Sequence, residues 1–528
     1  MTDQKTTANG KVSSQDAETA EHLEAGKWRR AAPQIIASTV KNLLLMDLGM
    51  TIAFSTIVIP VLLDGKDSKG LVFTEENASW FGSIIYACQP TGSVLSGLVL
   101  ESLGRKYAMM AVNVPHILGW FLLYSAGSHL ALYMAAMIMG LGVGFMEAPI
   151  ITYIGEICEP RLRGTLTSYS NLFVNFGMTS VFVLGTLVDW RHAALICMML
   201  PVLTILALTQ VPETPLWLMA QGREEDARKS LQWLRGWVSP QAVQNEVTEL
   251  KRYAEEAKKK KKIRGYDNPA IVLDENPSNQ TSPVKTEKVP ETVEVEKPSW
   301  MKKMARDAKD FFRPAVLKPF FFIIVFFFIS NWTGISSTRP YLIKLIEEFK
   351  FPIEPYRASV IFGSIGFCAS VMCMATIAWF RKRPIALISV FMCAFSGIGL
   401  AFTPSTALSG WACFILFVLL FFFSMYGASG IVWTVMSEIF PYRGRSQASG
   451  MAAASSYLIT FSATKSFLAL KHSLGLHNLF GVYGGISAFG FVFLYFMLPE
   501  TEGKSLEEIE NSLMFFSSLC DLGVFELG

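Results

Sequence analysis

The chain has 528 residues, of which 51% are hydrophobic, 13% are aromatic and only 17% are charged. Soluble proteins carry about 25% charged residues, so the composition excludes an ordinary soluble domain and indicates a protein that lies largely in lipid. The formal net charge of +3 is close to neutral, and we expect no nucleic-acid partner. The eight cysteines show no CxxC or Cys/His spacing, so we expect no metal site and no cofactor.

Apolar runs long enough to cross a bilayer recur along the chain. A span needs about 20 predominantly apolar residues. Six candidates lie near 37–62, 81–100, 108–127, 131–154, 165–188 and 193–211, and six more lie near 316–341, 357–380, 385–403, 411–437, 447–468 and 478–498. The pattern predicts an all-α membrane protein with twelve transmembrane helices in two bundles of six.

A hydrophilic segment separates the two sets of spans. Residues 222–236 show helical periodicity, whereas 265–298 are rich in Pro, Glu and Thr and are predicted to be disordered. Basic residues gather in alternate loops, which by the positive-inside rule places both termini in the cytoplasm. We therefore expect a cytoplasmic tail at 1–36, bundles at 37–211 and 316–498, a partly helical and partly disordered cytoplasmic loop at 212–315, and a second cytoplasmic tail at 499–528.

One signature occurs in both halves of the chain. Glu156 and Arg163 flank Pro160, and Glu438 and Arg445 flank Pro441 in the same way. A Pro-Glu-Thr triplet follows each half, with its acidic residue at Glu213 or Glu500. Repeated elements in two halves of a hydrophobic chain are typical of secondary transporters built from two related bundles.

The junction between the second and third spans reads GLVLESLGRK over residues 97–106. Its carboxylate, Glu101, and its basic pair, Arg105 and Lys106, are suited to bridging cytoplasmic helix ends by charge-assisted hydrogen bonds. The plain alternative is a loop whose basic residues only orient the helices.

Together these motifs resemble the sugar porter family of the major facilitator superfamily. The matching segments are the 97–106 junction, YIGEICEPRLRG at 153–164, PETPLWL at 212–218, WTVMSEIFPYRGR at 433–445 and PETEGKSLEEI at 499–509. Within the family the chain is most similar to insect facilitated trehalose transporters. The resemblance implies two pseudo-symmetric halves around one central site that opens alternately to each side. It also implies a cytoplasmic salt-bridge network made of Glu101, Arg105, Lys106, Glu156, Arg163, Glu213, Glu438, Arg445 and Glu500.

The central site departs from the family pattern. Asn171 stands where sugar porters carry a glutamine, and the seventh span keeps Thr333 and Gly334 but replaces three amides. Trp433 matches a family tryptophan, and Tyr457 stands where relatives carry another one. The candidate solute-binding residues are Asn171, Asn175, Ser330, Asn331, Thr333, Thr338, Arg339, Trp433 and Tyr457. A hexose, a different sugar, a polyol and a non-sugar solute all remain open.

Charged residues within the spans have two interpretations each. Arg339 either faces a cavity and binds solute or extends to the outer membrane surface. Asp47 and Glu147 either bind protons or pair with other residues. Proton-coupled relatives pair an aspartate in span one with an arginine in span four, and the latter position is Ala136 here. The resemblance therefore favours facilitated diffusion over proton symport.

The predicted function is facilitated transport of a carbohydrate, trehalose or hexose-like, across the plasma membrane. We find no Walker A sequence and no catalytic triad, so we expect no enzymatic activity. Two alternatives stay open: a transporter of a polyol or non-sugar solute, with or without proton coupling, and a nutrient receptor that does not transport. We expect a monomer in the lipid bilayer, and Asn77, in an Asn-Ala-Ser sequon, is a candidate glycosylation site.

Overall fold

The computed structural model describes residues 27–263, 314–403, 409–440 and 445–500, and these residues form helices and loops with no β-strand. The segment predicted to be disordered, 265–298, lies outside the described residues. So do most of the predicted N-terminal tail and nearly all of the C-terminal tail.

The first bundle consists of six long helices. They are α2 (Lys27–Leu63), α3 (Glu75–Leu103), α4 (Arg105–Ser125), α5 (His129–Ile157), α6 (Pro160–Leu187) and α7 (Trp190–Gln210). Three of these helices, α3, α5 and α7, begin after an N-cap residue. Thr74, Ser128 and Asp189 each accept a hydrogen bond from a backbone amide of the first turn. Helix α3 packs on α5, α2 packs on α6, and α4 packs on both α5 and α7.

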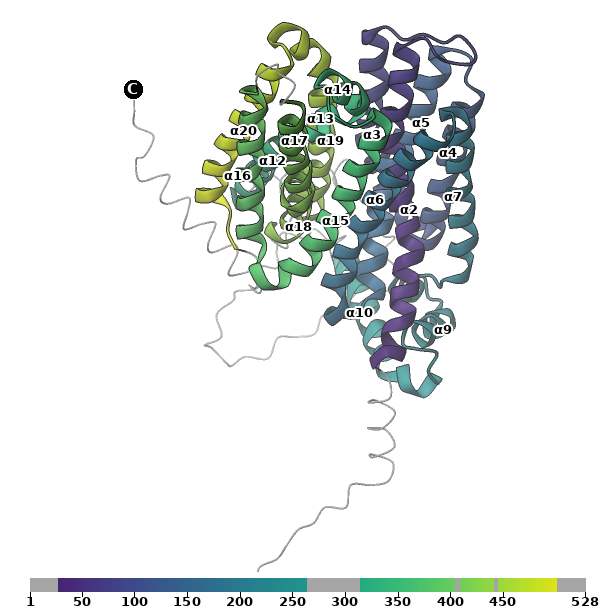
Figure 1. The fold of residues 1–528 in the computed structure, drawn as a ribbon. Helices are drawn as coiled ribbons and strands as arrows, with labels where there is room; N and C mark the ends of the chain where they lie inside the picture. The colour runs from purple at the N-terminus through teal and green to yellow at the C-terminus, as the bar shows by residue number, and fades with distance from the viewer. Residues whose placement is uncertain (1–26, 264–313, 404–408, 441–444, 501–528) are drawn as a thin grey trace, which may run out of the picture.

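Three short helices and the 20-residue helix α10 lie beneath the first bundle in Figure 1. They are α8 (Pro215–Ala220), α9 (Glu224–Leu234), the 3-10 helix η1 (Pro240–Val243) and α10 (Gln244–Ile263). A small apolar core that includes Leu218, Leu231 and Val247 holds them together. We call the end of the molecule that carries them the cytoplasmic end, following the positive-inside prediction, and the opposite end the extracellular end.

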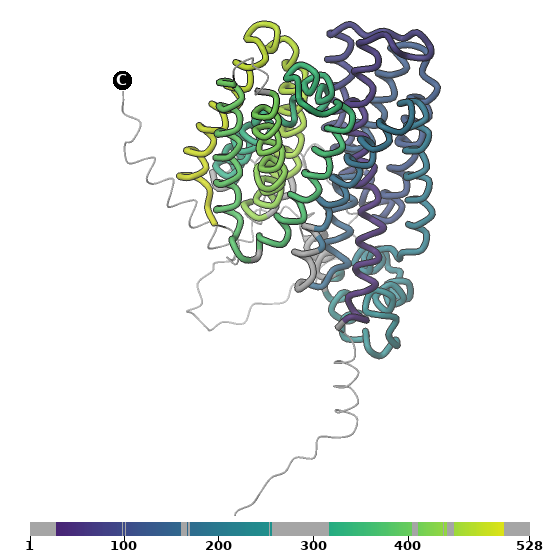
Figure 2. The backbone as a smooth tube through the Cα atoms, in the orientation of Figure 1, coloured from purple at the N-terminus to yellow at the C-terminus, as the bar shows by residue number. Residues whose placement is uncertain are grey.

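The second bundle contains more interrupted helices. Its elements are α12 (Pro314–Asn331), α13 (Ile335–Thr338), η2 (Arg339–Tyr341), α14 (Leu342–Glu348), α15 (Pro355–Phe380), α16 (Lys382–Ala401), α17 (Ser409–Phe423), the π-helical turn η3 (Ser424–Ala428), α18 (Gly430–Ile439), α19 (Arg445–Leu474) and α20 (Leu476–Met497). The two bundles stand side by side, the first in purple and blue and the second in green and yellow (Figures 1 and 2).

The seventh span is bent where its sequence departs from regular helix. Val316–Asn331 and Ile335–Glu348 meet at an angle of 51°. Gly334 lies between them at φ +105°, a backbone conformation that glycine adopts without the steric penalty of a side chain. Such breaks at membrane depth are tolerated where protein surrounds the freed backbone groups.

Length and hydropathy identify most of the predicted spans. Within the described residues nine helices are long and apolar enough to cross a membrane, and the bent pair makes ten. Helix α3 has 29 residues and is about as apolar as α4, whereas α19 has 30 residues and is more polar. They pack against each other between the bundles, where polar side chains contact protein in place of lipid. The count of twelve spans stays a prediction.

Candidate functional site

The two bundles are joined closely at the extracellular end. Thr56 of α2 donates a hydrogen bond to the Arg339 carbonyl at 2.8 Å. Ser79 of α3 donates to the Lys465 carbonyl at 2.9 Å, and Lys344 pairs with Asp64 at 2.5 Å. Every one of these contacts joins the first bundle to the second. They close the extracellular end with polar contacts made by α2, α3, η2, α14 and α19.

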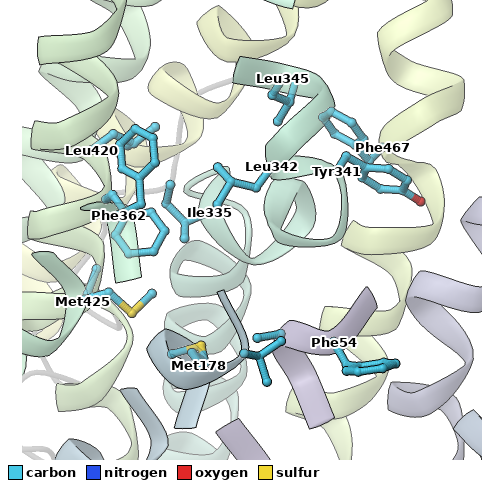
Figure 3. Close-up of a cluster of buried hydrophobic side chains, with 14 of the residues drawn as sticks. Phe54, Met178, Ile335, Tyr341, Leu342, Leu345, Phe362, Leu420, Met425 and Phe467 are labelled. Carbon is cyan, nitrogen blue, oxygen red and sulfur yellow. The ribbon is translucent and has the colours of Figure 1, made fainter. Parts of the chain in front are cut away.

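Apolar side chains fill the space below these contacts. Figure 3 shows Phe54 and Met178 of the first bundle facing a cluster from the second that includes Tyr341 and Phe467. The rings of Tyr341 and Phe467 stack with centroids 5.0 Å apart. A Cβ at Gly82 would come within 3.1 Å of the Pro340 side chain, so the backbones approach closely here. Solute cannot pass through a seal packed in this way.

Polar side chains follow deeper in the molecule, along the same interface. Asn175 of α6 is buried and donates to Ser370 of α15 at 2.8 Å. One helical turn closer to the cytoplasmic end, Asn171 is exposed although Gly430 of the second bundle lies beside its amide nitrogen. The Asn171 amide therefore lies beside the second bundle without being enclosed by it.

A chain of contacts crosses the interface at a similar depth. Tyr457 of α19 donates to Oε2 of Glu147 on α5 at 3.0 Å. Ser93 of α3 donates to the same oxygen at 3.4 Å. The Trp433 ring lies 6.0 Å from the Tyr457 ring, centroid to centroid. Asn331 accepts a hydrogen bond from Thr460 at 2.8 Å, which ties the end of α12 to α19. We call Asn171, Asn331, Trp433 and Tyr457 the polar layer.

Three of the predicted solute-binding hydroxyl groups donate to backbone carbonyls within the second bundle. Ser330 donates to Ala428 at 2.7 Å, in the π-helical turn, where irregular backbone leaves carbonyls exposed. Thr333 donates to Ser330, and Thr338 donates to Gly334 at the helix break. All three side chains are buried. Their part in solute binding stays a prediction.

The charged residues within the spans lie in different places. Asp47 is buried inside the first bundle, where it accepts a hydrogen bond from Trp120 at 2.9 Å and contacts His116. Arg339 is half-buried in the closed extracellular end, near Tyr86. Glu147 and Arg339 both reach the opposite bundle through their side chains, whereas the contacts of Asp47 stay within the first bundle. Neither carboxylate forms an ion pair with Arg339 among the described side chains.

The cytoplasmic ends of the two bundles repeat one arrangement. In the first, Arg105 pairs with Glu156 at 2.7 Å, and Glu213 accepts from the Lys106 amide at 2.9 Å. In the second bundle, Lys382 pairs with Glu438 at 2.5 Å. Glu500 accepts from the Arg383 amide at 3.3 Å there, in the position of Glu213. Each ion pair among the described cytoplasmic side chains stays within one bundle.

The backbone at these two junctions is also repeated. Gly104 precedes α4 with φ +86° and ψ +170°, and Arg381 precedes α16 with φ +61° and ψ +172°. This region of φ/ψ space is nearly restricted to glycine. The second bundle therefore reaches the same turn with a strained arginine in place of the glycine of the first bundle.

The side chains of Glu101, Arg163 and Arg445 lie outside the described set. Asn77 is described, and it accepts a hydrogen bond from Tyr133 at 3.1 Å, while Ser79 of its sequon is buried in the closed extracellular end. Burial raises the pKa of Glu213, although the amides of Thr214, Lys106 and Arg105 offset part of that effect.

Sequence reasoning did not identify some of the contacting residues. Ser93, Ser370 and Thr460 are common residue types without a distinguishing pattern. Lys382 was detectable, because aligning the two halves places it opposite Arg105. Among the described residues, no group of three or more metal-ligating side chains is gathered in one place.

Comparisons with known proteins identify the family of this chain. A family model described as "Sugar (and other) transporter" matches residues 49–513. The facilitated trehalose transporter Tret1 of Aedes aegypti is 28% identical over 494 residues, which cover 91% of this chain and 55% of that protein. Tret1 of Culex quinquefasciatus is 28% identical over 493 residues, covering 91% of this chain and 86% of that protein. The chain thus spans about half the length of the Aedes relative and most of the Culex one.

Solved structures show the same fold. The inward-open xylose transporter XylE from E. coli superposes with a TM-score of 0.68 at 17% identity, covering 90% of this chain and 99% of that one. XylE bound to 6-bromo-6-deoxy-D-glucose, described as a proton:xylose symporter of the major facilitator superfamily, gives 0.66 at 18% identity, covering 92% and 100%. The predicted all-helical major facilitator fold is confirmed. The match of the family model over most of the chain establishes that this protein belongs to the sugar transporter family.

Proposed function

We propose that this protein transports a neutral carbohydrate, trehalose or hexose-like, across the plasma membrane by alternating access. The observation that carries the proposal is the polar layer between the bundles, which lies directly below a closed extracellular end. Amide groups and aromatic rings at one depth suit a solute with many hydroxyl groups, because each buried hydroxyl left unpaired costs about 1–3 kcal/mol. One chain encloses the whole layer between its bundles, so a monomer suffices.

The mechanism requires two arrangements of the same bundles. In the present one, α2 and α3 contact η2, α14 and α19 at the extracellular end. Opening that end breaks these contacts, and we propose that a cytoplasmic network then joins the bundles instead. Glu156, Glu213, Glu438 and Glu500, with their basic partners, are the proposed members. A difference of a few kcal/mol between the arrangements is enough for both to be populated during a cycle.

Uptake by the purified protein in liposomes tests the proposal. Trehalose, glucose, other hexoses and polyols are supplied at two external pH values, with Glu438→Ala as the variant of impaired cycling. We expect saturable uptake of at least one carbohydrate, independent of pH and running in both directions along the gradient. Solute binding without flux would instead indicate a receptor and contradict the proposal. Cell-surface labelling of the expressed protein checks the plasma membrane assignment.

Proton-coupled transport is a second candidate function, and the placement of Glu147 favours it. Its carboxylate bridges toward the second bundle, so a change in its charge can affect the contact between bundles. Asp47 is a weaker candidate because its contacts stay within the first bundle. Uptake that rises as external pH falls, and that loses this dependence in Glu147→Gln, would support the second candidate over the first.

A further inference from the structure

Only one oxygen of the Glu147 carboxylate accepts hydrogen bonds from described residues. Tyr457 and Ser93 both donate to Oε2, at 3.0 and 3.4 Å. Oε1 accepts no hydrogen bond from a described residue. It also differs from the unpartnered polar atoms that are completely buried, because it is not one of them. One oxygen therefore fixes the side chain, while the other has no hydrogen-bond partner among the described residues.

The position of Glu147 makes an unused oxygen unexpected. It lies ten residues before the end of α5, which corresponds to about 15 Å of helix from the cytoplasmic end. A charged group at such depth is costly unless it is paired or reaches water. No described Lys, Arg or His forms an ion pair with it, whereas Asp47, the other carboxylate within the spans, contacts His116.

The surroundings of Oε1 indicate the chemistry of its missing partner. Tyr457 leads from Glu147 to the Trp433 ring, and aromatic rings offer apolar faces to the C–H side of a sugar. Asn171 supplies an exposed amide that both donates and accepts. A carboxylate acceptor and an aromatic ring, with the Asn171 amide beside Gly430 on the same interface, match a neutral molecule that carries several hydroxyl donors.

We propose that Glu147 is a solute-binding residue whose Oε1 accepts hydrogen bonds from hydroxyl groups of the carried solute. This inference rests on the proposed function and specifies its substrate class. Hydrogen bonds from a hydroxyl to a carboxylate are about twice as strong as those between neutral groups. In its ionised form the carboxylate also repels anions, so we expect phosphorylated sugars and uronic acids to be poor substrates. Tyr457 is a positioning residue, because it acts on the solute through Glu147.

Transport kinetics of the full chain in liposomes test this inference. Using a carbohydrate that the wild type carries, Glu147→Ala should raise KM about 10- to 100-fold, as expected for loss of a charge-assisted hydrogen bond. Tyr457→Phe, which frees Oε2, should raise KM only a few-fold. Thr152→Ala is the matched control, because Thr152 lies on the same helix and donates to the Ala148 carbonyl. It should leave KM unchanged.

Deoxy analogues of that carbohydrate locate the contact. Removing the hydroxyl that binds Oε1 should weaken uptake by the wild type but add no further loss in Glu147→Ala, since coupled groups are not additive. Equal losses in wild type and variant for every analogue would overturn the inference while leaving the proposed function intact. An unchanged KM with lost pH dependence in Glu147→Gln would also overturn it and assign Glu147 to proton binding. If the wild type carries no carbohydrate at all, the proposed function fails and this inference fails with it.

Discussion

One buried ion pair anchors the extracellular side of the first bundle. Asp67, in the loop after α2, pairs with Arg191 of α7 at 2.9 Å, and both side chains are almost fully enclosed. Trp190 also donates to Asp67 at 3.2 Å. Burial raises the pKa of Asp67, but hydrogen bonds from Arg191 and from the amides of Leu71 and Lys69 outweigh it and bring the pKa below its ordinary value.

Asp67→Asn should destabilise the protein by about 3–5 kcal/mol, because it leaves the Arg191 charge buried without its partner. Thermal unfolding in detergent, followed by tryptophan fluorescence, measures the loss. Since the folded-state pKa of Asp67 is lowered, its contribution is complete above the ordinary aspartate pKa and disappears as pH falls through the folded value. The wild type should therefore lose stability in acid more than the variant does. Parallel acid profiles for the two proteins would contradict the assignment.

The junction residues Gly104 and Arg381 offer a reciprocal pair of substitutions. Arg381→Gly should stabilise the protein by about 1 kcal/mol, because relief of about 1–3 kcal/mol of strain exceeds the entropy cost of glycine. Gly104→Ala should destabilise it, since a Cβ there would lie 2.5 Å from Oε2 of Glu213. The unfolding temperatures of both variants measure these changes. A lower unfolding temperature for Arg381→Gly would show that contacts of the arginine side chain outweigh the strain.

At the scale of elements, irregular helices in the second bundle are held by hydroxyl groups. The π-helical turn between α17 and α18 and the break between α12 and α13 both free backbone carbonyls. Ser330, Thr333 and Thr338 donate to such carbonyls at 2.7, 3.1 and 2.5 Å. A backbone group left without a hydrogen bond at membrane depth costs several kcal/mol. These side chains remove part of that cost and so stabilise the broken helices.

Ser330→Ala distinguishes this structural role from solute binding. It leaves the Ala428 carbonyl without its donor, which should cost about 1–3 kcal/mol of stability. We expect a lower unfolding temperature and an unchanged KM for the carried carbohydrate. Ser364→Ala is a suitable control, since Ser364 donates only to the Val360 carbonyl within the unbroken helix α15. A raised KM with unchanged stability would restore Ser330 to the solute site.

For the whole molecule, the balance between the two ends decides which side the polar layer faces. The extracellular contacts described above join the bundles, whereas each cytoplasmic ion pair among the described side chains stays within its own bundle. The structure is thus closed toward the outside. Glu438 pairs with Lys382 in this state, and we expect it to gain a partner from the first bundle when the extracellular end opens.

Glu438→Gln should shift the population toward the arrangement seen here, because it weakens contacts that exist only in the other one. Labelling of an Asn171→Cys reporter by an impermeant thiol reagent should become slower from outside the cell. Asp64→Lys, placed opposite Lys344, should have the reverse effect, and adding Lys344→Asp should restore the original rate. Exposed ion pairs contribute only about 0.2–1 kcal/mol, so Asp64→Lys should change the labelling rate by at most about fivefold. Unchanged labelling in Glu438→Gln would contradict the proposed network.

The amino-acid sequence alone determined that this chain is a helical membrane protein with two related halves. Span length and hydropathy are local properties, so apolar runs predicted the helices, including the one broken at Gly334. The repeated Glu/Arg signature predicted equivalent cytoplasmic junctions, and the structure contains them at Glu156 and Glu438. Resemblance in motifs spread over the whole chain identified the family.

Only the tertiary structure decided which polar groups meet. Glu147 and Tyr457 are 310 residues apart and belong to different bundles, so no local pattern connects them. Asp47 contacts His116 and Trp120, and the hydroxyl groups near Gly334 donate to backbone, because packing sets the rotation of each helix about its axis. Residue type indicates what a side chain is able to bind; the face it occupies, and the partner it finds there, follow from contacts between elements distant in sequence.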